Sequence, residues 1–230
     1  MSKTMHTLSR ALVITVLTLT TAASAQTERP SSCKACPEWN EAQPAFQVFG
    51  NTYYVGTHGL SSILVTSEGG HILIDGALPE SAPLIGAGIR SLGFRIEDVK
   101  FIVNSHAHFD HAGGIAELQR LSGARVAASE WTADVMNKGA LPRDDPQFGT
   151  IAPIARVARV ETIKDGETLS AGAVTVTAHL TPGHTPGGTS WTWRSCENGR
   201  CLNLVYADSL TPVSADGFLF TRYVRDRTRA

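Results

Sequence analysis

Four side chains that can bind a metal ion fall within six residues of one another in this chain. They are His106, His108, Asp110 and His111, and they lie in the stretch Asn104–Gly114. Imidazole and carboxylate groups are ordinary ligands of Zn²⁺, and three or four of them suffice for a catalytic site with an open position. The plainer alternative is a polar loop that is merely rich in histidine. The density of ligands favours a metal site.

The neighbouring segments indicate how these ligands are held. Val99–Val103 is apolar and rich in β-branched residues, which is typical of a buried strand. The run Ile115–Leu121 has apolar residues at helical spacing. We therefore expect the ligands on a loop between a strand and a helix. His106 and His108 alternate, so they share a face in an extended segment, whereas the two ligands beyond the bend can point at a second position nearby.

A second histidine-bearing stretch, Leu180–Thr189, supports the metal site. Its His184 lies in a turn rich in proline and glycine, where the backbone is shaped to present one side chain. We predict that His106, His108 and His184 form a three-imidazole zinc site. The other two ligands of the first stretch then make most of a second zinc site.

At this point the chain resembles the metallo-β-lactamase superfamily, whose signature is His-x-His-x-Asp-His followed by a Gly-His turn. Further segments resemble subclass B3 of the true metallo-β-lactamases: Asn51–Val55, Ile72–Gly76, His184–Trp191 and Tyr206–Leu210. The resemblance covers the chain roughly from Trp39 to Phe220.

The resemblance implies a secreted zinc-dependent hydrolase that confers antibiotic resistance. Such an enzyme opens the β-lactam ring of penicillins, cephalosporins and carbapenems by a zinc-bound hydroxide. Asp110 would orient the nucleophile and take part in proton transfer. Ser209 and Thr211 would bind the substrate carboxylate, or else cap their own loop backbone. Asp75 would steady the metal loop, or else cap the turn after its strand.

One part of the family pattern has no counterpart here. The family has three protein ligands for each of two zinc ions, and the last ligand is a late histidine. No histidine follows His184, so the second site lacks its third ligand. We expect a truncated or frame-shifted reading of a longer enzyme, without the last strands and the C-terminal helix. Two alternatives stay open: a glyoxalase II-like thioesterase in which Asp208 bridges both metals, and an inactive truncated product that binds zinc.

The N-terminal residues 1–25 predict a secretory signal peptide. Lys3 and Arg10 give a basic start, and an apolar run leads to the small residues Ala23-Ser-Ala25. The apolar run is shorter than the roughly 20 residues that cross a bilayer. We therefore expect a periplasmic protein that is not attached to the membrane after cleavage. A net charge of -1 indicates neither a nucleic acid nor an anionic membrane as partner.

The composition, 42% hydrophobic over 230 residues, allows one domain with a full core. We expect an N-terminal segment over 26–38, the domain over 39–220 and an arginine-rich tail over 221–230. Strands are predicted at 46–49, 52–55, 62–66, 72–75, 99–103, 124–128, 161–163, 173–178, 188–193 and 202–206, helices at 79–92, 115–122 and 130–137, and a long loop at 138–153. Their alternation in each half favours two packed sheets with helices outside, an αββα sandwich of mixed α and β class (α/β or α+β).

Four cysteines are expected to be oxidised in an exported protein. Cys196 and Cys201 flank an Asn-Gly pair, which is a strong hairpin signal, so we predict a disulfide between them. Cys33 and Cys36 form either a local disulfide or a pairing with another chain. The remaining histidines of the domain, His58, His71 and His179, are expected on the surface.

Overall fold

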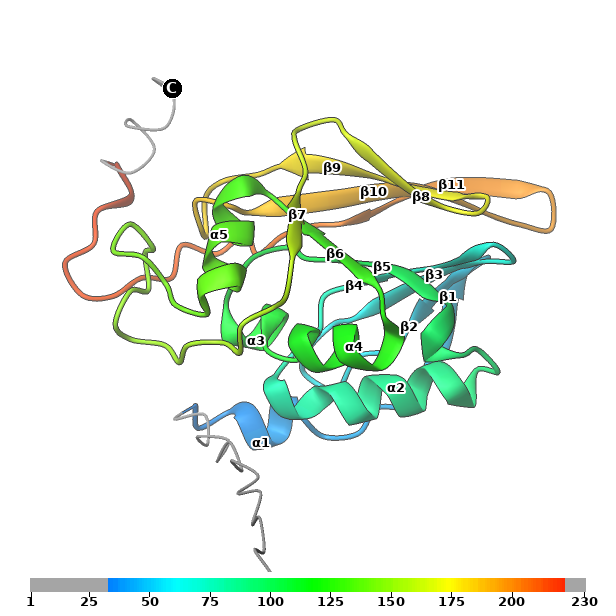
Figure 1. The fold of residues 1–230 in the computed structure, drawn as a ribbon, viewed down its shortest axis with the longest axis horizontal. Coiled ribbons are helices and arrows are strands. Elements are labelled where there is room, and N and C mark those ends of the chain that lie inside the picture. The colour runs from blue at the N-terminus through cyan, green and yellow to red at the C-terminus, as the bar shows by residue number, and fades with distance from the viewer. Residues whose placement is uncertain (1–32, 222–230) are drawn as a thin grey trace, which may run out of the picture. The chain divides into compact units, whose positions relative to one another are not determined.

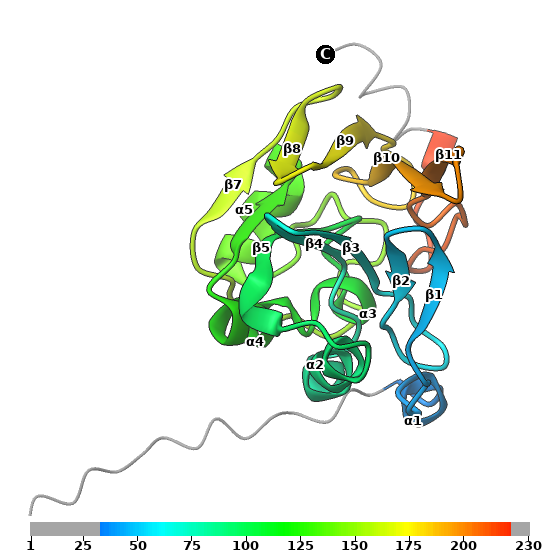
Figure 2. The same cartoon turned by 90° about the vertical axis from the view of Figure 1, so that its right-hand side faces the viewer.

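The computed structural model describes residues 33–221 of the chain. The predicted signal peptide and all but the first residue of the predicted tail lie outside these residues. The described part forms three layers: helices, a seven-stranded sheet and a four-stranded sheet (Figures 1 and 2). The metal-type ligands lie at one edge of the two sheets.

The larger sheet has its strands in chain order. They are β1 (Phe46–Phe49), β2 (Thr52–Tyr54), β3 (Ile63–Ser67), β4 (Gly70–Ile74), β5 (Val99–Val103), β6 (Arg125–Ala128) and β7 (Val160–Thr162). Neighbours are antiparallel from β1 to β4 and parallel from β4 to β7. Every residue of β4 is buried, as expected for a strand covered on both faces.

The smaller sheet is antiparallel, in the order β11-β10-β9-β8. Its strands are β8 (Thr168–Ala171), β9 (Val174–Leu180), β10 (Thr189–Glu197) and β11 (Arg200–Tyr206). Trp191 and Trp193 of β10 are buried in one apolar cluster with Ile72 and Ile74 of β4 and Val103 of β5. This cluster joins the two sheets, because it draws its side chains from both of them.

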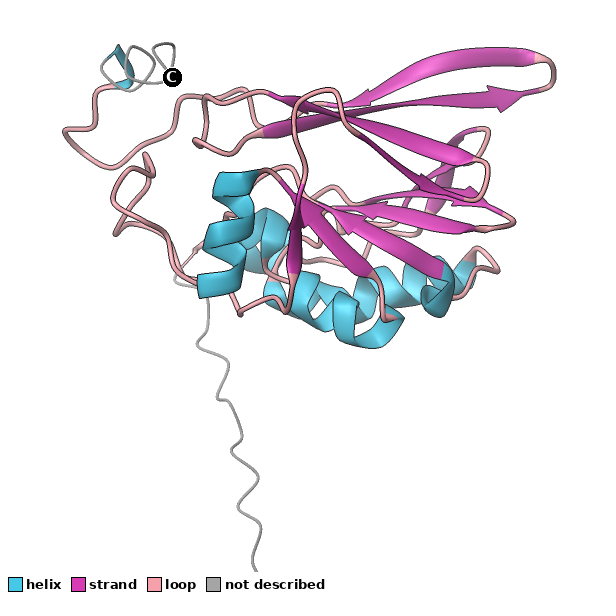
Figure 3. Cartoon of the chain, turned by 45° about the horizontal axis from the view of Figure 1, so that its top comes forward, coloured by secondary structure: helices cyan, strands magenta, loops and turns pink. Residues whose placement is uncertain are grey.

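Helices cover the other face of the seven-stranded sheet (Figure 3). They are α1 (Cys36–Trp39), α2 (Ala82–Ser91), α3 (Phe109–Ala112), α4 (Ile115–Ser122) and α5 (Glu130–Lys138), with 3-10 turns η1 (Pro79–Ser81) and η2 (Ile96–Asp98). The helices α4 and α5 end at Gly123 and Gly139, both at φ 70°, where a residue without a Cβ is favoured. All five α-helices contribute to the second apolar cluster, on this side of the sheet.

The mixed α and β class with two packed sheets is confirmed. Within residues 33–221, all helices that pack into an apolar core cover the seven-stranded sheet. The second helical layer expected for an αββα sandwich, outside the four-stranded sheet, is not seen in these residues. None of the described helices is long and apolar enough to cross a membrane.

Four elements were not expected from the sequence: α1, η2, α3 and β8. The packed region also begins before Trp39, because Cys36 is only 3% exposed and belongs to the core. The prediction of a surface position for His71 is wrong, since its side chain is buried on β4 and its ring packs against Phe94 at 5.1 Å between centroids. His58 and His179 are exposed, as expected.

Candidate metal centre

The centre is built where β4 and β5 end side by side. The two strands are parallel, so the residues that follow them leave the sheet at the same edge. Asp75 follows β4, and the stretch 104–108 follows β5. The junction between α3 and α4 packs closely against this edge of the sheet, since a Cβ on Gly114 would collide with the carbonyl oxygen of Gly76. Glycine at position 114 therefore lets the ligand-bearing turn approach the sheet.

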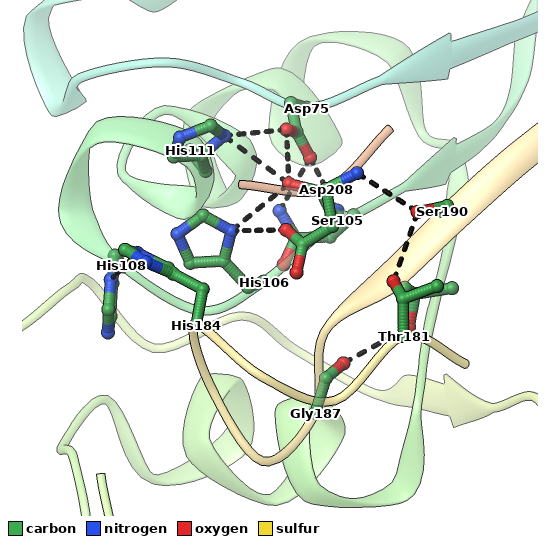
Figure 4. A network of polar contacts seen from close by, with 12 residues as sticks. Asp75, Ser105, His106, His108, His111, Thr181, His184, Gly187, Ser190 and Asp208 are labelled. Atoms are coloured by element: carbon green, nitrogen blue, oxygen red, sulfur yellow. Dashed lines mark hydrogen bonds and ion pairs between the residues drawn. The ribbon is translucent and has the colours of Figure 1, made fainter. Parts of the chain in front are cut away.

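The predicted ligands converge in two groups that share one histidine. His106, His108 and His184 each offer a ligand atom, and these atoms lie within 4.8 Å of one another. The same holds for His106, Asp110 and His111. Asp110 and His111 lie on the single helical turn α3 and not on the loop expected from the sequence. Figure 4 shows the imidazoles facing one another.

Each imidazole donates through its outer nitrogen to an acceptor behind it. His106 Nδ1 lies 2.8 Å from Asp208 Oδ1, and His111 Nδ1 lies 2.9 Å from Asp75 Oδ2. An ionised carboxylate only accepts hydrogen bonds, so with Asp208 and Asp75 ionised these nitrogens carry the proton. His184 Nδ1 likewise lies 2.8 Å from the carbonyl oxygen of Thr211. In the neutral rings of His106 and His184 the opposite nitrogen is left with its lone pair directed into the cluster, as metal ligation requires.

Asp75 organises the loop that carries the ligands. Its Oδ1 accepts from the Asn104 side chain and the Ser105 backbone at 2.8 and 2.7 Å. Its Oδ2 accepts from the Ser105 hydroxyl at 2.6 Å and from the Tyr206 hydroxyl at 2.9 Å, besides His111. Asp75 has φ 61°, a left-handed conformation that is uncommon for a residue with a Cβ. Of its two proposed roles, these contacts support steadying the metal loop.

The donor set fits a metal ion. Nε2 of His106 is buried and has no hydrogen-bond partner among the described residues. Burial, with the neighbouring imidazoles, holds the pKa of His106 well below its ordinary value, and burial also lowers the pKa of His184. Neutral imidazoles with a free lone pair are what a cation binds. A buried nitrogen without a partner is otherwise costly.

The second group carries more negative charge. Burial alone would lower the pKa of His111, but the hydrogen bond and charge of Asp75, followed by the charge of Asp110, raise it to about 9. A metal at this position must displace that proton. In the described part of the chain, the third ligand-type residue beside Asp110 and His111 is His106, which also belongs to the first group. A third ligand that belongs to the second group alone is not seen there.

Asp208 does not take the bridging position of a glyoxalase II-like site. Its Oδ1 contacts Nδ1 of His106, on the far side of that ring from the free Nε2. Its backbone N–H donates to Ser190 Oγ at 3.0 Å. Burial raises the pKa of its carboxyl to about 7. Asp208 is therefore an outer partner of a ligand, and it belongs to neither metal-type group.

A cleft of about 460 Å³ opens over the centre. His108, Asp110 and His184 line it, together with the predicted substrate-binding residues Ser209 and Thr211. Its other lining residues include the apolar Trp39, Phe109, Ile151 and Val213. The cleft thus joins a cluster of ligands to hydroxyl groups and to apolar walls, which suits a small polar molecule with apolar substituents.

Several residues at the metal centre or its cleft were missed by sequence reasoning. Asp145 contacts His108, and Gln147 reaches toward both His108 and His184. Both lie in the loop predicted at 138–153, where no periodic pattern marks an individual side chain. Cys33 and Trp39 form a further wall of the cleft. Cys33 precedes the expected start of the domain, and Trp39 lies at it.

The cysteines pair within the chain. Cys196 and Cys201 face each other across the β10–β11 hairpin with Cα atoms 4.0 Å apart. Its turn contains Asn198 and Gly199 at positive φ, as the Asn-Gly pair predicts. Cys33 and Cys36 also pair with each other, with Cα atoms 5.4 Å apart, which is the local alternative.

Solved structures similar to this chain are metallo-beta-lactamases. The Rm3 metallo-beta-lactamase is 54% identical with a TM-score of 0.82, covering 86% of this chain and 76% of its own. MEM-A1, a subclass B3 metallo-beta-lactamase isolated from a soil metagenome library, is 52% identical with a TM-score of 0.80, and the match covers 83% of this chain and 75% of MEM-A1. MIM-1 from Novosphingobium pentaromativorans is 42% identical with a TM-score of 0.77, and the match covers 92% of this chain and 76% of MIM-1.

Sequence comparison points the same way. The model of the Metallo-beta-lactamase superfamily matches residues 55–197. Hydroxyacylglutathione hydrolases from Methylobacterium nodulans and Rhodopseudomonas palustris are 30% and 31% identical over 107 residues, which is 46% of this chain. The match spans 32% of the length of each of these two relatives.

Proposed function

This chain belongs to the metallo-beta-lactamase superfamily, and from that premise we propose that it is a zinc-dependent hydrolase of the subclass B3 type. Its substrates would be β-lactam antibiotics, whose amide ring it opens. The observation that carries the proposal is the convergence of three imidazole nitrogens beneath an open cleft, in rings whose other nitrogens each face a hydrogen-bond acceptor. Imidazole donors of this number are typical of a catalytic zinc site with an open position.

His106, His108 and His184 would hold the first zinc, and Asp110 and His111 would contribute to a second. When bound in such a site, zinc lowers the pKa of a water molecule to about 7 and polarises a carbonyl group. The outer partners keep the imidazoles in the required tautomer before any metal arrives. The protein therefore supplies an ordered ligand set and not a flexible histidine-rich loop.

Asp110 is the candidate proton carrier. Its carboxylate lines the cleft and lies 3.7 Å from Nε2 of His111. An acceptor at this place can orient a water molecule toward the substrate carbonyl and take its proton. Ring opening leaves an amide nitrogen that must gain a proton, and the same carboxyl group is placed to return it.

Ser209 and Thr211 would bind the carboxylate that β-lactams carry. Both residues line the cleft, on the segment that follows β11. Thr211 has a second role, since its carbonyl oxygen accepts from His184 Nδ1. A substrate held by this segment would therefore lie next to the first metal position.

We also propose export to the periplasm, on the strength of the basic start, apolar run and small-residue cleavage site of residues 1–25. Both cysteine pairs would then be oxidised. Alkylation and intact-mass measurement of periplasmic material test this, because free thiols at these four positions contradict it.

The proposal is tested on protein purified from the periplasm. Zinc per chain is measured together with the hydrolysis of nitrocefin and imipenem. We expect zinc-dependent turnover that falls roughly 100- to 10,000-fold in Asp110→Asn, the range for loss of a general base. Asp134→Asn, on the exposed face of α5, is the matched control. Bound zinc without turnover would instead indicate an inactive zinc-binding product.

A thioester hydrolase is the second candidate, because hydroxyacylglutathione hydrolases are among the relatives. The position of Asp208 behind His106 counts against it. A glutathione thioester is assayed beside the β-lactams on the same preparation. Faster thioester than β-lactam hydrolysis would reverse the order of the two proposals.

A further inference from the structure

His108 is held from behind by a carboxylate that lies outside the histidine motif. Its Nε2 lies 3.1 and 3.2 Å from Oδ2 and Oδ1 of Asp145, a residue 37 positions further along the chain. Its Nδ1 faces Nε2 of His184 at 3.2 Å. Since a carboxylate only accepts, the proton of His108 sits on Nε2 and the Nδ1 lone pair faces the metal position.

Asp145 is fixed by its own loop. The residue is 1% exposed, and its Oδ1 accepts from the backbone N–H of Gln147 at 2.7 Å. Its backbone N–H donates to Pro142, and its carbonyl oxygen accepts from Phe148, each at 3.1 Å. Among residues 33–221, His108 is the basic side chain within ion-pair distance of this carboxylate. A buried carboxylate needs such a partner, so the contact between Asp145 and His108 is a specific feature of the fold.

The same loop forms part of the cleft. Gln147, Thr150 and Ile151 line the cleft, so the turn that positions Asp145 also shapes the substrate pocket. The carbonyl oxygen of Pro146 accepts from the backbone N–H of Ala215 at 2.7 Å, which ties the loop to the segment after β11. A shift of the loop would therefore move the outer partner of His108.

We propose that Asp145 is the positioning residue of His108 and that it links the 142–151 loop to the first metal position. It fixes the tautomer and the orientation of the ring, as carboxylates behind metal-binding imidazoles do. This inference rests on the zinc part of the proposed function and is independent of the β-lactam substrate.

The test compares zinc affinity in the mature chain and in three variants. Asp145→Ala removes acceptor and charge, Asp145→Asn keeps an acceptor without the charge, and Asp144→Asn removes the neighbouring charge of the same loop. Competition with a chromophoric chelator gives the dissociation constant of the tighter zinc. We expect a loss of roughly 10- to 100-fold for Asp145→Ala, the range for outer partners of metal ligands, and a smaller loss for Asp145→Asn. Asp144→Asn should stay close to the unmodified chain.

A second readout separates positioning from general damage. In the zinc-loaded chain labelled with ¹⁵N-histidine, the proton of His108 should reside on Nε2 with slow exchange, and in Asp145→Ala that exchange should become fast. Melting of the metal-free variants in chelator shows whether they fold. Unchanged zinc affinity and unchanged proton exchange in a folded Asp145→Ala variant would overturn the inference.

The outcomes distinguish this inference from the proposed function. If the Asp145 variants bind zinc more weakly but the unmodified chain does not hydrolyse β-lactams, the role of Asp145 is supported and the proposed substrate is wrong. If the chain hydrolyses β-lactams fully and the Asp145 variants bind zinc normally, the proposed function is supported and the role of Asp145 is wrong.

Discussion

The acceptors behind the four imidazoles differ in kind, and this difference ranks the histidines as ligands. Carboxylates stand behind His106, His108 and His111, whereas a backbone carbonyl stands behind His184. A carboxylate raises the basicity of the ring more than a neutral carbonyl does. His106 and His108 are also fully or almost fully buried, while His184 is partly exposed. The first metal position therefore depends most on the two histidines of the signature motif.

Replacing His108 with alanine should abolish zinc retention at the first position. Two imidazoles would remain, fewer than the three protein ligands of a catalytic zinc site. Activity should fall by more than the roughly 100-fold that loss of an outer partner costs. Zinc per chain is measured after dialysis against a weak chelator, with His179→Ala on the exposed face of β9 as the control. Stoichiometric zinc in the His108 variant would show that the ligand assignment is wrong.

His71 should make the fold less stable in mild acid. Burial lowers its pKa from the ordinary value of 6.5, and its Nδ1 has no hydrogen-bond partner among the described residues. The unfolded chain therefore binds a proton that the folded chain resists, so stability falls as the pH drops below about 6.5. In His71→Leu this part of the decline should disappear.

The measurement is the free energy of unfolding between pH 7.5 and about 5 in chelator, so that zinc release does not contribute. The exposed His58→Gln variant is the control and should follow the unmodified chain. Equal slopes for His71→Leu and the unmodified chain would contradict a depressed pKa at this residue.

At the scale of elements, β5 and α4 match the sequence prediction because their apolar pattern is continuous and bounded. Gly114 and Gly123 border α4, and β5 is an unbroken run of five residues. The turn α3 was not predicted, since Phe109–Ala112 is a single turn within the ligand motif and has no period of its own. Asp145 was not predicted as part of the site, because its place there rests on a contact with His108, 37 positions away, that local sequence does not encode.

The β10–β11 hairpin should be stabilised by its predicted disulfide. Cys196 and Cys201 are opposite each other in the register, at the end of the longest paired strands of the smaller sheet. Closing so short a loop restricts the unfolded chain by about 2 kcal/mol in the chain-entropy estimate. Cys196→Ser with Cys201→Ser should lower stability by about that amount and leave zinc content unchanged. No loss of stability in the double variant would argue against the bond.

At the scale of the whole molecule, the metal centre depends on the packing of both sheets. Trp191 of β10 donates from its indole N–H to the carbonyl oxygen of Asn104 at 3.2 Å, which braces the ligand loop from the smaller sheet. Tyr206 of β11 reaches Asp75 on the larger sheet. Ligands and outer partners thus come from segments that meet only in the folded chain. Metal binding is therefore coupled to folding.

This coupling predicts two steps when zinc is added to the metal-free chain. The first position has three imidazoles, whereas the second has Asp110 and His111 of its own and shares His106 within the described residues. The first zinc should therefore bind more tightly. At 100 times its dissociation constant it should stabilise the fold by about 2.7 kcal/mol, which corresponds to a rise in Tm of roughly 5–10 °C.

Thermal melts across a zinc titration measure both steps. His111→Ala should remove the second step and keep the first, and His108→Ala should remove the first. Each step is assigned by its own variant, because the two residues belong to different ligand groups that meet at His106. Two zinc ions that bind with equal affinity would contradict the ranking. They would mean that a ligand beyond residues 33–221 or from another chain completes the second position.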